Sequence, residues 1–163
     1  MSANPSAANA KVLVIDDDNS VRLVTTAILR SFGLTVTAAS QSGREAFAMA
    51  GLTPADMGVV QLYDAFTINT LLFLEDLGFC KKGEGGKFVA DGNLISGVGK
   101  LPFNTDGGGL CNNHPANRGG ITKVIEAVRQ LRGEAHPAVQ VKNCDIALAH
   151  GTGGFLGSRH GSA

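Results

Sequence analysis

KVLVIDDDNSVRLVTTAILRSFGLTVTAA, residues 11–39, decides the fold class of this chain. Its first five residues, KVLVI (11–15), are apolar and rich in β-branched side chains, which is typical of a buried parallel strand. Apolar residues at helical spacing then predict a helix over 19–32, which Gly33 ends. LTVTAA (34–39) reads as a second strand. A strand, a helix and a strand in this order predict parallel strands in an α/β sheet.

The rest of the chain alternates in the same way. Ser42 and Glu45 form a capping box that opens the second helix, and Asp64 is expected to cap the third. The glycine- and lysine-rich segment 79–100 is expected to be a long loop with a short strand near 87–90. The sequence therefore predicts one layered α/β/α sheet with helices on its faces. We expect further helices over 42–51, 64–77 and 121–131, and further strands over 57–62, 101–104 and 144–150.

Composition bounds the class of protein. The 163 residues are 44 % hydrophobic and 17 % charged, which is enough for the core of one domain, or of one domain and a fragment. Lys+Arg and Asp+Glu balance at 14 each, so the charge gives no sign of a nucleic-acid partner. The three cysteines, an odd number without a CxxC pair, argue against a disulfide framework and a thiolate zinc site. We expect buried or half-buried free thiols.

The first ten residues, MSANPSAANA, are small and polar, without the basic and apolar regions of a signal peptide. We expect a disordered tail over 1–10. The longest apolar runs are too short to cross a bilayer. The expectation is a soluble, cytoplasmic protein without a membrane partner.

NTDGGGLCNNHPANRGG, residues 104–120, is a glycine-rich loop that leads into the last predicted helix. Glycines 107–109 allow backbone N–H groups to approach a ligand closely, which suits an oxyanion or a phosphate. His114 lies just before the positive end of that helix, which favours the neutral imidazole that a general base requires. The alternative is a histidine that only hydrogen-bonds within the loop.

The first forty residues resemble the start of a response-regulator receiver domain, in its first strand, acidic cluster, first helix and second strand. This resemblance implies that Asp16 and Asp17 hold Mg²⁺ beside a phosphate-accepting aspartate, since carboxylates at the end of a strand suit a hard cation. The acceptor position falls near Gln61, however, where the third strand reads GVVQLYD. The favoured alternative is that the aspartates form a polar strand end and a helix cap.

From residue 42 onward the chain resembles a different family. SGREAFAMAGLTPADMGVVQLYDAFTINTLLFLEDLGFC (42–80), the glycine-rich loop and LAHGTGGFLGSRHGSA (148–163) look like three motifs of the C-terminal domain of thiolases, in the family's order. The sterol-carrier and lipid-transfer branch, resembling acetyl-CoA acetyltransferases, is the most similar. The resemblance implies a coenzyme A thioester as substrate and no tightly bound cofactor.

The resemblance also implies roles for individual residues. Tyr63 opens the motif whose first residue, in thiolases, holds a water or the substrate near an oxyanion hole. His114 takes the place of the histidine that activates the nucleophilic cysteine. His150 replaces the cysteine that serves as second acid/base, and Gly153 and Gly154 continue that motif. A histidine at this position puts thiolysis in doubt and favours related carbon–carbon chemistry such as retro-aldol cleavage. The alternatives are a core tyrosine and a satisfied histidine at a strand end.

The two resemblances together predict a chimera joined near 38–44. Its parts are the tail, a receiver-like β-α-β segment over 11–41, and a thiolase-like domain over 42–163 that lacks its last strand. The expected activity is that of a thiolase-type acyltransferase or related lyase. Because the half that bears the cysteine nucleophile is absent, the expected partners are acyl-CoA and either a complementary thiolase half or another copy. The alternatives are a signalling module with Mg²⁺-dependent aspartate phosphorylation and an inactive chimera.

Overall fold

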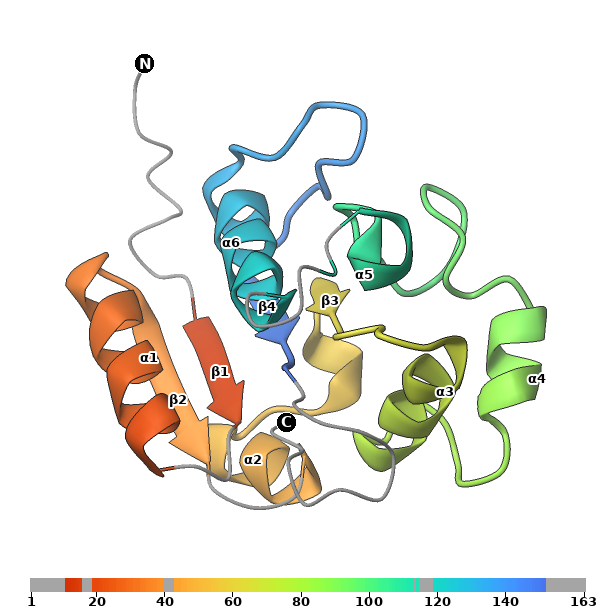
Figure 1. Cartoon of the computed structure of the whole chain (residues 1–163), viewed down its shortest axis with the longest axis horizontal. Helices are drawn as coiled ribbons and strands as arrows, with labels where there is room; N and C mark the ends of the chain where they lie inside the picture. The colour runs from red at the N-terminus through yellow and green to blue at the C-terminus, as the bar shows by residue number, and fades with distance from the viewer. Residues whose placement is uncertain (1–10, 16–18, 40–42, 113, 115–118, 152–163) are drawn as a thin grey trace.

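A four-stranded parallel sheet organises the chain (Figure 1). The structure, a computed structural model, describes residues 11–15, 19–39, 43–112, 114 and 119–151. The strand order is β2-β1-β4-β3, and every neighbouring pair is parallel. The strands are β1 (Lys11–Ile15), β2 (Thr35–Ala39), β3 (Val59–Gln61) and β4 (Ile146–Ala149).

Helices cover both faces of the sheet. On one face, Leu29 of α1 packs with Ala127 and Leu131 of α6. On the other face, Phe47 of α2 packs with Leu74 of α3. This is the layered α/β/α arrangement that the sequence predicted. The helices are α1 (Asn19–Ser31), α2 (Gly43–Ala50), α3 (Thr67–Asp76), α4 (Gly85–Ala90), α5 (Gly108–Cys111) and α6 (Gly119–Arg132), with a 3₁₀ turn η2 (Pro54–Asp56) before β3.

The two central strands divide their side chains between two cores. In β4, Ala147 lies in the core beneath α1 and α6, whereas Leu148 lies in the core beneath α2 and α3. Val59 and Val60 of β3 alternate in the same way, and all four side chains are fully buried. Successive residues of a strand point to opposite faces, so a strand buried on both faces is mainly apolar. Gln61 of β3 is the polar exception, and its buried amide donates to Thr105.

Three local predictions were wrong. Residues 85–90 form the helix α4 rather than a strand, and its first N–H, from Gly85, donates to Glu75 at 2.8 Å. Asp64 does not cap α3, which begins at Thr67 after Phe66 without a side-chain cap. The predicted strand over 101–104 is reduced to one parallel bridge between Phe103 and Val60.

The segment assigned to a receiver-like unit is part of the same sheet as the rest. β1 pairs with β2 on one side and with β4 on the other, so that Leu13 lies opposite Leu148. The proposed boundary near residue 41 stays a prediction. Among the described residues, no helix is both long and apolar enough to cross a membrane.

Candidate active site

Tyr63 and His114 meet at the carboxyl end of the sheet. Tyr63 follows β3, and its hydroxyl oxygen lies 2.8 Å from Nδ1 of His114, 51 residues further along the chain. The tyrosine side chain is buried, whereas the histidine is exposed. The pair therefore joins a fixed phenol to an imidazole that is open to solvent, which is a hydrogen-bonded arrangement suited to moving a proton.

The position of the Tyr63 ring depends on the first residue of α6. A Cβ atom on Gly119 would lie 2.5 Å from the tyrosine hydroxyl oxygen, so only glycine leaves room for the ring. Burial raises the pKa of the Tyr63 phenol, and the negative charge of Asp64 raises it further. Both effects keep the phenol protonated near neutral pH, so it acts as a neutral donor or acceptor rather than as a phenolate.

Asp64 ties the glycine-rich loop to the end of β3. Its carboxylate accepts the N–H of Gly109 at 2.5 Å and the N–H of Leu110 at 3.3 Å, and these donors belong to the first turn of α5. The residue therefore caps a helix 45 positions away rather than the one that follows it. Gly107 and Gly108 have φ values of +94° and +70°, which side chains rarely adopt, so the loop depends on glycine there.

The N–H groups of the three glycines in the loop all donate hydrogen bonds within the chain. Gly107 donates to the carbonyl of Asn104, Gly108 donates to the carboxylate of Asp106, and Gly109 donates to Asp64. The prediction that these three donors face a ligand is therefore corrected, because each N–H already has an acceptor within the chain. Buried backbone donors must be paired, and the carboxylates of Asp106 and Asp64 pair the buried Gly108 and Gly109.

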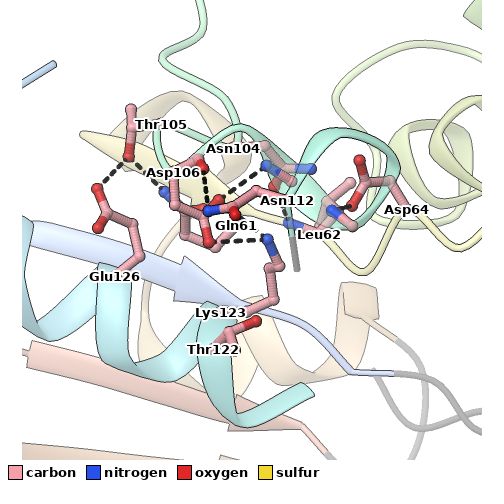
Figure 2. A network of polar contacts seen from close by, with 12 residues as sticks. Gln61, Leu62, Asp64, Asn104, Thr105, Asp106, Asn112, Thr122, Lys123 and Glu126 are labelled. Atoms are coloured by element: carbon pink, nitrogen blue, oxygen red, sulfur yellow. Dashed lines mark hydrogen bonds and ion pairs between the residues drawn. The ribbon is translucent and has the colours of Figure 1, made fainter. Parts of the chain in front are cut away.

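A polar network fixes the loop to α6, as Figure 2 shows. The ammonium group of Lys123 binds the carboxylate of Asp106, at 3.0 and 3.1 Å. One residue before Asp106, the Thr105 hydroxyl donates to Glu126 at 2.7 Å and accepts from the Gln61 amide at 2.8 Å. The network thus joins β3, the strand that Tyr63 follows, to the glycine-rich loop and α6.

Sequence reasoning missed this network, although a signal was present. Lys123, Glu126 and Gln130 recur at helical spacing within the apolar pattern of α6, and all three are buried. A polar stripe on the buried side of a helix indicates partners elsewhere in the chain, since buried polar groups are paired.

His150 does not join the Tyr63–His114 pair. Its imidazole is 3 % exposed and packs on Phe73 of α3, with ring centroids 4.2 Å apart. Burial lowers the pKa of His150 to about 3, so the ring is neutral, and its Nδ1 has no hydrogen-bond partner among the described residues. Tyr63 instead packs against the start of α6, on the other side of the sheet. The structure thus brings together two of the three predicted site residues.

Other predicted residues are accounted for as follows. Asp16, Asp17, Gly153 and Gly154 lie outside the described residues. Within the described part of the chain, no group of three or more acidic, histidine or cysteine side chains is arranged to hold a metal. The three cysteines are free thiols, but Cys111 in α5 is exposed, contrary to the expected burial.

A surface pocket of about 360 Å³ lies away from the pair. Met57, Phe79, Phe88 and Leu101 are among the residues that line it. Met57 precedes β3, whereas Tyr63 follows it. The pocket therefore opens near the amino end of β3, and the candidate pair lies beyond its carboxyl end.

Comparison with known proteins identifies the class. Residues 22–162 match the family described as thiolase C-terminal domain-like, and the chain belongs to that family. It is 42 % identical over 123 residues to an acetyl-CoA acetyltransferase of Methanothermobacter thermautotrophicus, covering 76 % of this chain and 32 % of that protein. It is 46 % identical over 112 residues to a 17-hydroxy-3-oxo-4-pregnene-20-carboxyl-CoA lyase of Mycobacterium tuberculosis, covering 68 % and 28 %.

Two further relatives are similar. A steroid side-chain-cleaving aldolase of Thermomonospora curvata is 48 % identical over 91 residues, covering 56 % of this chain and 22 % of that protein. A solved structure of the Ltp2-ChsH2(DUF35) aldolase superposes with a TM-score of 0.56 at 43 % identity, covering 63 % of this chain and 25 % of that one. The chain therefore spans a third or less of the length of the relatives it matches.

These findings confirm the thiolase part of the sequence interpretation. The family match begins at Arg22, inside the segment assigned to a receiver-like start, and none of these relatives is a receiver domain. The signalling alternative therefore has no support. The thiolase-like acyl-CoA module, by contrast, agrees with the family and with the α/β fold.

Proposed function

We propose that this chain forms part of a carbon–carbon lyase that cleaves a 3-hydroxyacyl-CoA thioester by a retro-aldol reaction. The 2.8 Å contact between the Tyr63 hydroxyl and His114 Nδ1 is the observation that carries the proposal. Two relatives with 46 % and 48 % identity are named a CoA lyase and a side-chain-cleaving aldolase, which supports this chemistry.

The proposed step moves one proton through the pair. The Tyr63 oxygen accepts the proton of the substrate 3-hydroxyl group while its own proton passes to Nδ1 of His114. The C2–C3 bond then breaks, its electron pair forms the enolate of the thioester, and C3 becomes a ketone or an aldehyde. The proton held by the pair returns to C2 and gives a shortened acyl-CoA. A neutral phenol between alcohol and imidazole suits this relay, and such acid–base groups contribute roughly 10²–10⁴-fold to rate.

The cysteines argue against thiolysis by this chain alone. Burial raises the pKa of the Cys144 thiol to about 11, and burial also raises that of Cys80. Both stay protonated at neutral pH and are poor nucleophiles. Thiolysis would therefore need Cys111, which is exposed in α5, or a cysteine from another part of the fold.

We assign His150 a positioning role in this scheme. Its neutral ring packs on Phe73 of α3 just after β4, and its backbone N–H donates to the carbonyl of Gln61 at 2.8 Å. Gln61 lies two residues before Tyr63, so this contact helps to fix the end of β3 rather than to move a substrate proton.

The test uses the full chain co-expressed with the Thermomonospora curvata aldolase from which the matched segment is deleted. A 3-hydroxyacyl-CoA with a tertiary hydroxyl group is added, and mass spectrometry follows the ketone and the shortened acyl-CoA. Tyr63→Phe keeps the ring and removes the hydroxyl, so we expect a fall in cleavage rate of about 10²–10⁴-fold. His114→Ala should have a similar effect.

His136→Ala serves as the matched control, because His136 is an exposed histidine whose Nδ1 contacts only the nearby N–H of Ala138 among the described residues. It should leave the rate unchanged. A parallel reaction supplies a 3-ketoacyl-CoA and free CoA. Thiolysis that survives Tyr63→Phe and is lost in Cys111→Ala would replace the lyase with an acyltransferase.

A further inference from the structure

The surface pocket near the amino end of β3, which we call the β3 pocket, is apolar and carries one charge. Its volume of about 360 Å³ lies at the lower end of the range for small-molecule sites. Lys100, which is exposed, is the one charged residue among the described residues that line it. Two aromatic rings and two buried apolar side chains form much of the wall: Phe79, Phe88, Met57 and Leu101.

Hydrogen bonds and a ring contact hold the walls of the β3 pocket in place. The buried side chain of Asn93 donates to the carbonyl of Phe88 at 2.8 Å. The carbonyl of Asn93 accepts the N–H of Leu101 at 3.0 Å, so one residue ties two parts of the wall together. Phe79 packs edge-on against Phe47, with ring centroids 6.3 Å apart. Phe88 belongs to α4, which lies beside α3 (Figure 1). The pocket is thus largely formed before a ligand binds, which lowers the cost of binding.

The wall offers few free partners to a polar ligand group. Apart from Lys100, Thr53 is the one residue with a polar side chain among the described residues of the lining, and its hydroxyl donates to Asp56 at 2.7 Å. A ligand hydroxyl or amide carried into the pocket would lose its hydrogen bonds to water. The body of a ligand should therefore be a hydrocarbon. Five N–H groups of the lining already donate within the chain, those of Met57, Gly78, Phe79, Phe88 and Leu101.

Lys100 supplies a positive charge without a negative partner. The ion pairs between lysine and carboxylate in the described part of the chain use Lys82 and Lys123, so the ammonium group of Lys100 has no carboxylate there. A single charged group beside an apolar pocket fixes the orientation of a ligand. The charge that complements an ammonium group is a carboxylate.

We propose that the β3 pocket binds a small monocarboxylate with a hydrocarbon body. Its carboxylate contacts the ammonium group of Lys100, and its body packs against the rings of Phe79 and Phe88. The pocket lies near the amino end of β3, whereas Tyr63 follows the carboxyl end. The site is therefore separate from the candidate active site, and the inference does not depend on the proposed function.

The experiment titrates octanoate into the full, isotope-labelled chain and follows the backbone amide signals by NMR. We expect saturable shifts at Gly78, Phe79 and Leu101, with a dissociation constant in the millimolar range or tighter. Ala55→Phe fills the pocket from an exposed position in η2 and should abolish these shifts. Ala138→Phe is the matched control, because Ala138 is exposed after α6 and does not line the pocket.

The charge is tested on both partners. Lys100→Gln should weaken octanoate binding about twofold to fivefold, the effect expected of an exposed ion pair. Lys142→Gln should leave it unchanged, because Lys142 is exposed and does not line the pocket. Octanamide has the same length without the charge, so it should bind the unaltered chain and Lys100→Gln equally weakly. Because its hydroxyl enters the apolar part of the pocket, ω-hydroxyoctanoate should bind about fivefold more weakly than octanoate, or worse.

Several outcomes overturn the proposal. Octanoate shifts that are not saturable, or that survive in Ala55→Phe, would exclude the β3 pocket as the site. Equal binding of octanoate and octanamide to the unaltered chain would exclude the carboxylate. A dimer of the chain that Ala55→Phe dissociates would make a second copy the occupant. The titration is repeated on the complex with the segment-deleted aldolase, where loss of binding would show that another part of the fold covers the pocket.

Tyr63→Phe separates this inference from the proposed function. It should bind octanoate as tightly as the unaltered chain while losing lyase activity. Octanoate binding that follows the predictions, with lyase activity that does not depend on Tyr63, would contradict the function alone. Thermal unfolding of each variant checks that it is folded. If Ala55→Phe does not fold, the comparisons of Lys100→Gln and of octanamide still decide the outcome.

Discussion

Lys123 and Asp106 form a buried ion pair between α6 and the glycine-rich loop. The lysine side chain has no exposed surface, the aspartate side chain is 12 % exposed, and the ammonium group contacts both carboxylate oxygens. Lys123→Met should lower the free energy of unfolding by about 3–5 kcal/mol, because it leaves a buried carboxylate without its charge partner. Urea unfolding at pH 7 measures this effect.

The double variant Lys123→Met with Asp106→Asn should recover most of that loss, since no uncompensated charge remains. Lys82→Met is the matched control. Lys82 pairs with Asp76, but both side chains are more than half exposed, so the loss should be below about 1 kcal/mol. A similar loss of unfolding free energy for Lys82→Met and Lys123→Met would show that burial does not strengthen the contribution of the Lys123 pair to stability.

Substitution of alanine for each of the first two residues of α6 should change the stability of the fold in opposite directions. Gly119→Ala puts a methyl group against the Tyr63 ring and should destabilise the fold by about 1–3 kcal/mol. Gly120→Ala meets its nearest atom at 3.8 Å and should stabilise the helix by up to about 1 kcal/mol. Thermal unfolding compares the two. Equal changes would mean that Tyr63 does not lie where the structure has it.

The single tyrosine makes the ionisation of Tyr63 directly observable. The chain has one tyrosine and no tryptophan, so tyrosinate absorbance reports this residue alone. Burial raises the pKa of Tyr63 above its ordinary value of 10.0, so the native midpoint should lie above the midpoint in urea. The neutral phenol stabilises the fold below pH 10, and this contribution disappears as pH rises through the folded pKa. A native midpoint at or below that in urea would contradict the burial.

His150 should make stability depend on pH in the acid range. Burial lowers its pKa from 6.5 to about 3, so the unfolded chain binds the extra proton between these values. The stabilisation is complete above pH 6.5 and declines as pH falls toward 3, by up to about 1.4 kcal/mol per pH unit. His150→Leu should remove this slope, as measured by urea unfolding between pH 7 and 4.5. The exposed His136→Leu should keep it, and an unchanged slope in His150→Leu would contradict the assignment.

Local patterns predicted most of the elements, and the family resemblance predicted the two site residues that meet. Short apolar runs around Val60 and Leu148 indicate buried strands, and the apolar residues of α6 at helical spacing indicate a helix. Both signals lie within a few consecutive residues, so the sequence is enough to detect them. The pairing of Tyr63 with His114 followed from motifs that resemble a family, and the sheet brings them together across 51 positions.

The predictions that failed depend on contacts between residues that are far apart in the sequence. Asp64 stands where a cap of the next helix is expected, yet its carboxylate oxygens accept the N–H groups of Gly109 and Leu110. The imidazole of His150 points to the face opposite Tyr63, since side chains alternate along strands and β3 and β4 fix which face each one takes. Neither outcome can be obtained without the register between strands.

The strand order also fixes when this four-stranded sheet can form. β1 and β3 make no ladder with each other, and β4, formed by residues 146–149, joins them. Until β4 has formed, no backbone ladder links the β1–β2 pair to β3, and only packing against helices such as α2 holds them near each other. Assembly of the sheet is therefore a late, long-range event, and a nascent chain shorter than this strand leaves the facing edges of β1 and β3 unpaired and prone to association with other chains.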